Sequence, residues 1–182
     1  MAAFTKLKYI FNSRKINIET KIRTMDCYVK SIFLYNCEIW TTTKEIEKII
    51  DVFQRNLLRR ILHIYWRDKV SNERLYERSK TKPWSRVVKY RRLSWLGHLL
   101  RLHEETPAKQ ALREHLRPVK RPRGKPKTTW ISVVNKDLEI VQNNMKINSE
   151  TLEHYSKLAE NRKEWSAMIG RAMSAGDGGV QN

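Results

Sequence analysis

The chain has 182 residues, of which 37 are Lys or Arg and 19 are Asp or Glu, so its formal net charge is +18 at pH 7. A hydrophobic content of 40% is enough for one core, or for one core and an appended helical unit. The sequence contains no apolar run as long as a membrane span, no apolar secretory leader, and no Cys-x-x-Cys pair. We therefore expect a nuclear or cytoplasmic protein that does not enter membranes.

The positive charge is concentrated in the middle of the chain. Residues 55–127 contain 22 Lys or Arg and 6 Asp or Glu, a local net charge of +16. Charge this dense repels itself in an isolated domain, and a single basic stretch is typical of nucleic-acid-binding proteins. The sequence therefore predicts a nucleic acid, RNA or DNA, as the partner, bound mainly through its phosphates.

The first half of the chain has helical periodicity. Apolar residues three and four apart predict a helix over 19–35, and Asn36 is a residue type that tolerates the left-handed conformation at a helix end. A second helix is predicted over 44–64, with its arginines away from the apolar face. Ser71 or Asn72 is expected to cap a short helix through Tyr76.

Helical periodicity continues in the second half. Pro83 precedes a helix predicted over 84–102, in which Arg91, Ser94, His98 and Arg101 share one face. Further helices are predicted over 107–116, 130–141 and about 149–169. Because no strand pattern is present, we expect an all-α, irregular multi-helix bundle. We divide it into a helical region (1–116), a basic Pro/Gly linker (117–129), a C-terminal helical hairpin (130–173) and a disordered tail (174–182).

The linker contains the sequence PRGKP at residues 122–126, which resembles the AT-hook that enters the minor groove of A·T-rich DNA. Lys125 stands where the AT-hook core has arginine, and the two cations differ in hydrogen-bonding geometry. Three alternatives remain open: a linker that touches phosphates without sequence preference, which we favour, a groove-binding ribbon, and a linker that makes no contact.

For the histidines and tryptophans, we compare a functional role with ordinary packing in the core. His98 and His103 are five residues apart and face different sides of a helix, so we favour packing or a phosphate contact for His98 over a metal site. The six tryptophans fit a core better than a base-stacking surface.

No arrangement of side chains in the sequence indicates catalysis, and we expect neither a metal nor a cofactor in this chain. The candidate functional residues are all basic. The predicted nucleic-acid contacts are Arg55, Arg59, Arg60, Arg67, Lys89, Arg91, Arg92, Arg101, Arg121, Arg123, Lys125 and Lys127.

Four stretches, in order, resemble the region that follows the polymerase palm in non-LTR (LINE-type) retrotransposon endonuclease–reverse transcriptases. The segment 2–41 ends in Leu34-Tyr35-Asn36-Cys37-Glu38-Ile39-Trp40, similar to the family pattern Leu-Tyr-Gly-x-Glu-x-Trp with Asn36 in place of Gly. Residues 53–78 resemble the helices next to the thumb. RRLSWLGHLLRL and RPRGKPKTTWISVVNKDL resemble two later elements, and a weaker match surrounds Trp165.

The resemblance implies a thumb-like segment of an RNA-directed DNA polymerase that grips nucleic acid and is not itself catalytic. The family's Tyr-x-Asp-Asp palm motif, its fingers and its endonuclease are not in this sequence, so Mg²⁺ is implied only for the intact enzyme. The alternatives are a helical protein-interaction module and a transposon relic without independent activity.

Overall fold

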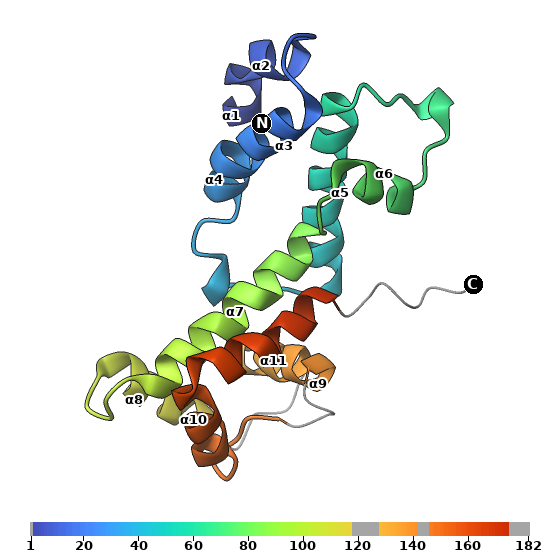
Figure 1. Cartoon of the computed structure of the whole chain (residues 1–182). Helices are drawn as coiled ribbons and strands as arrows, with labels where there is room; N and C mark the ends of the chain where they lie inside the picture. Colours follow the sequence, from blue (N-terminus) through green and yellow to red (C-terminus); the bar gives the residue numbers. More distant parts are fainter. Residues whose placement is uncertain (1, 118–127, 142–145, 175–182) are drawn as a thin grey trace. The chain divides into compact units, whose positions relative to one another are not determined.

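A computed structural model of the protein describes residues 2–117, 128–141 and 146–174 (Figure 1). Within these ranges the regular structure is helical and no strand occurs, so the predicted all-α multi-helix fold is confirmed. The chain divides into two compact units. Unit 1 comprises Met1–Asn36 and Lys44–Ser85, and unit 2 comprises Cys37–Thr43 and Arg86–Asn182.

The helices of unit 1 precede residue 80. They are α1 (Ala2–Lys6), α2 (Lys8–Asn12), α3 (Ile18–Thr24), the π-helix η1 (Met25–Lys30), α4 (Ser31–Phe33), α5 (Lys44–Ile61), the 3₁₀ helix η3 (Trp66–Asp68) and α6 (Asn72–Ser79). The helix predicted over 19–35 is therefore present, but its middle is wound as a π-helix. The cap predicted for the short helix is confirmed, because Ser71 Oγ accepts a hydrogen bond from the backbone N–H of Arg74 at 3.3 Å.

Left-handed residues end the helical segments of unit 1. Asn36, predicted to tolerate this conformation, has φ 52°. His63 also has φ 52°, and the N–H of Ile64 reaches back to the carbonyl of Arg59 at 2.9 Å, as in a Schellman motif. Helix α5 consequently ends at Ile61, three residues earlier than predicted.

The core of unit 1 combines aliphatic and aromatic side chains. The Phe33 and Phe53 rings stack with centroids 4.4 Å apart, and Trp84 packs against both. The first two backbone N–H groups of α7 (Trp84–Arg101) have side-chain partners. They are satisfied from α5, because Gln54 Oε1 accepts from Trp84 N at 2.8 Å and Asp51 Oδ1 accepts from Ser85 N at 2.9 Å.

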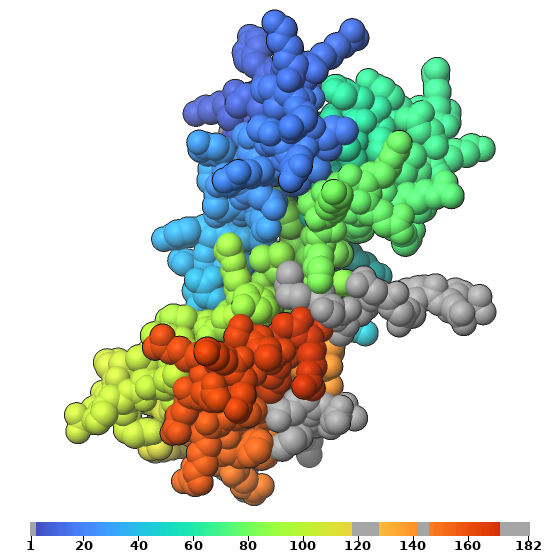
Figure 2. Space-filling view, in the orientation of Figure 1, coloured from blue at the N-terminus to red at the C-terminus, as the bar shows by residue number. Residues whose placement is uncertain are grey.

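Unit 2 is built on α7. Its helices are η2 (Cys37–Ile39), α7 after its first two residues, α8 (Pro107–Leu116), α9 (Trp130–Val141), α10 (Leu152–Glu160) and α11 (Arg162–Ser174). Leucines of α7 share one core with apolar residues of α8, α9, α10 and α11. In the space-filling view the red atoms of α11 lie directly against the yellow-green atoms of α7 (Figure 2).

The terminal helix predicted over 149–169 is two helices, α10 and α11, which separate at Asn161. Asn161 Oδ1 accepts from Lys163 N at 3.1 Å and Glu164 N at 3.3 Å, while Asn161 Nδ2 donates to Glu164 Oε1 at 2.7 Å. This cap begins a new helix and satisfies N–H groups that a continuous helix would bond to carbonyls.

The predicted linker and tail fall mostly on residues 118–127 and 175–182, which lie outside the described residues. The division of the chain at 117–129 therefore stays a prediction. Among the described helices, none combines the length and apolar character needed to cross a bilayer.

Candidate nucleic-acid interface

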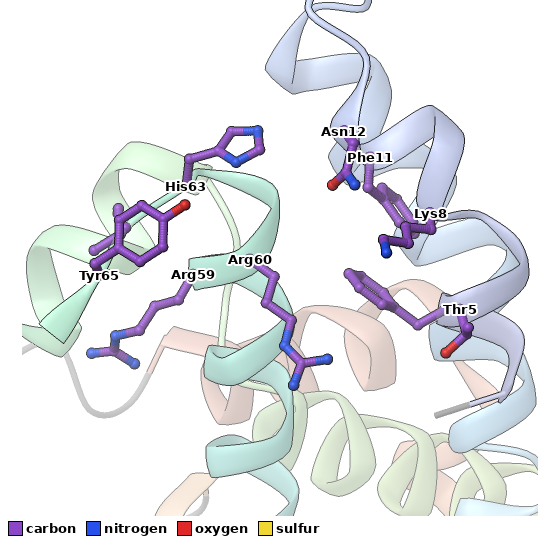
Figure 3. A pocket seen from close by; sticks show the side chains of 10 residues that line it. Thr5, Lys8, Phe11, Asn12, Arg59, Arg60, His63 and Tyr65 are labelled. Atoms are coloured by element: carbon purple, nitrogen blue, oxygen red, sulfur yellow. The ribbon is translucent and has the colours of Figure 1, made fainter.

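Unit 1 contains a pocket of about 460 Å³ between the N-terminal helices and the C-terminal end of α5 (Figure 3). We call it the basic pocket. The residues that line it are Phe4, Thr5, Lys8, Phe11, Asn12, Arg59, Arg60, His63, Ile64 and Tyr65. Three of these residues are permanently cationic, one is a histidine, and none is acidic.

One wall of the basic pocket is formed by α1 and α2. The rings of Phe4 and Phe11 stack with centroids 4.4 Å apart, and the two side chains are buried. This stack joins two short helices that would not be stable alone. Lys8 lies between the two phenylalanines in sequence and is exposed, so the aromatic pair fixes the backbone from which its ammonium group extends.

The opposite wall is the turn that follows α5. The left-handed His63 reverses the chain, and the backbone N–H of Tyr65 donates to Asp68 Oδ2 at 2.7 Å. These two features hold the turn in place while 68% of the Tyr65 residue remains exposed. The turn therefore presents an aromatic ring and an imidazole beside the pocket.

The three cations of the basic pocket are not equivalent. Figure 3 shows Lys8 directed from α2 into the space between the walls, and Arg60 extending from α5 on the opposite side. Arg59 is turned away, and its Nη2 donates to Asn72 Oδ1 at 2.9 Å. Lys8 and Arg60 are thus the cations available to an anion in the pocket, whereas Arg59 is held by a neighbouring element.

Unit 2 has a second, shallower hollow on α7, of about 410 Å³, which we call the α7 hollow. Arg91, Ser94 and His98 line it together, as their shared helix face predicted, whereas Arg101 does not. The Trp95 ring lies beside the His98 ring, with centroids 5.1 Å apart. Because Trp95 is only half-buried, the α7 hollow also pairs a cation with an aromatic surface.

The carboxylate of Glu38 lines the α7 hollow and reduces its positive charge. The Arg91 guanidinium also has a partner within the protein. Arg91 Nη1 donates to Cys37 Sγ at 3.8 Å. Burial raises the pKa of the Cys37 thiol, and the nearby Arg91 charge opposes that increase. Since the basic pocket has no acidic lining residue, it is the stronger candidate for an anion site.

Arg92 was predicted to contact nucleic acid because it lies in the basic stretch, but the structure removes it from the candidate contacts. Its side chain is fully buried in unit 2, where Nη1 pairs with Asp137 Oδ2 at 2.5 Å and Nη2 donates to Thr42 Oγ1 at 2.7 Å. A buried guanidinium that holds three segments together cannot meet a phosphate in this structure. Helix periodicity gives no signal of such a distant partner.

The other predicted contacts are placed as follows. Arg101 is half-buried and its Nη1 donates to the carbonyl of Ala159 at 3.0 Å, while Arg55 and Lys89 are half-buried on α5 and α7. Arg67 is exposed, with its guanidinium carbon 5.7 Å from the centroid of the exposed Trp66 ring. Arg121, Arg123, Lys125 and Lys127 lie outside the described residues.

Sequence reasoning missed Lys8, His63 and Tyr65. Lys8 lies far from the basic stretch in sequence, and folding alone brings it to α5. The histidine follows a helix end that was placed three residues too late. Among the described residues, no three His, Cys, Asp or Glu side chains are grouped so that they could hold a metal ion.

Comparison with known protein families gives a match in the N-terminal region. Residues 3–35 match a domain of unknown function (DUF6451). The matched segment runs from α1 to α4 and so includes the Phe4–Asn12 wall of the basic pocket. No curated protein and no solved structure matches the chain.

Proposed function

We propose that this protein binds nucleic acid through basic helical surfaces and is a non-catalytic, C-terminal segment of a LINE-type RNA-directed DNA polymerase. Phosphate contacts would supply most of the affinity, with little sequence preference. Four ordered sequence motifs support the polymerase assignment. The binding role has independent physical support, because it follows from charge and from the lining of the basic pocket.

The observation that carries the binding role is the acid-free lining of the basic pocket. Lys8 and Arg60 come from elements about 50 residues apart in sequence, yet both line the same space. Cations that converge without a neighbouring carboxylate repel each other, and an anion relieves that repulsion. Exposed Arg67 lies a few residues further along the same turn and extends the positive surface.

A salt titration tests the proposal. Affinity for a fluorescent duplex and for a fluorescent single strand is measured by anisotropy at increasing salt, using the full chain. We expect log K to fall linearly with log salt, with a slope of about −0.9 for each phosphate contacted on duplex DNA. Absence of binding to both probes at low salt would refute the proposal. Heparin serves as the control polyanion, and binding no tighter to nucleic acid than to heparin would favour a general acidic partner.

A protein-interaction role is favoured by one further observation. Tyr28, Ile32 and Tyr35 follow one another at spacings of four and three, and they are 60%, 65% and 72% exposed. Adjacent exposed apolar side chains of this size are typical of surfaces that another domain or protein covers. Under the polymerase proposal, the missing palm and fingers are the partners that would pack here.

Substituting all three residues by Ser tests this role. Because the side chains are exposed, we expect the thermal midpoint to change little, while self-association at high concentration, followed by sedimentation velocity, decreases. A large loss of thermal stability would mean that these side chains support unit 1 itself and do not await a partner.

A further inference from the structure

We propose that the basic pocket binds one unpaired nucleotide of a single strand, with its phosphate between Lys8 and Arg60 and its base against Tyr65. The inference rests on the proposed nucleic-acid binding and adds to it the form of the nucleic acid: the pocket takes a single strand in preference to a duplex.

The shape of the pocket favours an unpaired nucleotide. A volume of about 460 Å³ is within the range of sites that enclose small ligands. A duplex presents its phosphates on a convex surface and keeps its bases stacked inside, so it cannot place a base in such a pocket. A single strand can turn one nucleotide out of its stack and into a concave site.

The cations are placed for one phosphate. Lys8 and Arg60 are exposed and approach from opposite walls (Figure 3). Within the described part of the chain, neither side chain has an ion-pair or hydrogen-bond partner. A phosphate between them would receive charge-assisted hydrogen bonds from both, and the planar Arg60 fork can donate two in parallel.

The remaining lining groups suit a base. Tyr65 is 68% exposed, and its backbone is held by Asp68, so its ring offers a positioned surface for stacking. Asn12 and His63 line the pocket from opposite sides, near the top of the view in Figure 3. An amide and an imidazole can each donate or accept hydrogen bonds at a base edge.

The proposed site also gives a role to part of the domain of unknown function that residues 3–35 match. Phe4, Thr5, Lys8, Phe11 and Asn12 all belong to the segment 3–35 that matches the domain of unknown function. The first two helices of that segment would then supply the phosphate-binding lysine and the aromatic support beneath it.

The test compares two double variants with equal loss of charge. Lys8→Ala with Arg60→Ala removes the two pocket cations. Lys6→Ala with Arg14→Ala removes two exposed cations that do not line the pocket, are not predicted contacts and lie close to Lys8 in sequence. The probes are an unstructured oligothymidine of about 12 nucleotides, similar in length to known single-strand sites, and a duplex of the same length.

We expect the pocket variant to bind the oligothymidine at least about tenfold more weakly than the control variant, because two charge-assisted hydrogen bonds are lost. On the duplex, the two variants should bind equally. If the two variants lose affinity equally for both probes, the pocket is not the binding site, and only general phosphate binding remains supported. Failure of the unmodified protein to bind either probe would instead overturn the proposed function.

A second pair tests the base contact and does not depend on charge. Tyr65 lines the pocket, and its neighbour Trp66, 84% exposed, does not. Tyr65→Ala should weaken oligothymidine binding by about fivefold or more, as expected for loss of one stacked base, whereas Trp66→Ala should not. A larger loss of binding in Trp66→Ala than in Tyr65→Ala would place stacking outside the pocket and overturn the inference. A circular-dichroism melt of each variant confirms that it is folded.

Discussion

Gly97 in α7 lies where α11 crosses, and substituting it by alanine should destabilise unit 2. A Cβ added at this position would be 2.3 Å from Trp165 Nε1 and 2.7 Å from two carbon atoms of the same indole. The indole is not free to move away, because Trp165 is buried and its Nε1 donates to the carbonyl of Leu93 at 3.1 Å.

The size of the effect is a balance of three terms. Alanine is better than glycine inside a helix by about 0.8–1 kcal/mol. Forcing the indole aside costs about 1–3 kcal/mol in overpacking, and losing its buried hydrogen bond costs about 1–3 kcal/mol more. We therefore expect Gly97→Ala to lower the free energy of unfolding by about 1–5 kcal/mol.

Gly170 in α11 provides a matched control. A Cβ added there meets no atom within 4 Å, so Gly170→Ala should raise stability by about 0.5–1 kcal/mol through helix propensity alone. Urea unfolding, followed by far-UV circular dichroism and tryptophan fluorescence, measures both variants. Stabilisation by Gly97→Ala equal to that of Gly170→Ala would refute the close crossing of α7 and α11.

Three further predictions concern buried polar groups of unit 2. Asp137→Ala should cost about 3–5 kcal/mol because it leaves the Arg92 guanidinium buried without its counter-charge, and replacing both residues by apolar ones should recover much of that loss in the same urea assay. The Tyr155 hydroxyl is buried and has no hydrogen-bond partner among the residues that the structure describes, so Tyr155→Phe should leave the unfolding free energy unchanged or raise it; a loss above about 1 kcal/mol would reveal a partner. Burial raises the pKa of both Tyr155 and Cys37, so the folded state keeps these protons at a pH where the unfolded state releases them. As pH rises above about 8.5, stability should therefore fall more in the unmodified protein than in Cys37→Ala; an equal change in the two proteins would contradict the assignment.

The fold was largely predictable because its helices have strong local signals. Periodic apolar residues, together with a proline at the start of α7 and of α8, located α7, α8 and α9 to within a residue at each end. The predicted helices differed from the observed ones where the backbone departs from α-helical geometry while the apolar spacing continues. The π-helical turn after Thr24 leaves no mark in the apolar spacing, and the left-handed His63 is a rare conformation for a residue other than glycine.

One missed feature did carry a signal. The α10–α11 break could have been recognised, because Asn161 followed three residues later by Glu164 has the pattern of a capping box. The pattern lay within a longer run of apolar periodicity, which we interpreted as one helix. Gly97 shows the opposite case, since only the tertiary contact with Trp165 explains why a glycine occupies the middle of α7.

The candidate site was less predictable, because charge alone does not separate residues that bind a partner from residues that build the fold. Several cations of the basic stretch are used internally. Arg92 pairs with Asp137, and the buried Lys109 Nζ donates to the carbonyl of Leu100 at 2.6 Å near the end of α7. These side chains stabilise the helices from which the exposed cations extend, so removing them would also weaken binding by unfolding unit 2. Only comparison of exposed pairs with equal charge, as for Lys8 and Arg60, separates recognition from support of the fold.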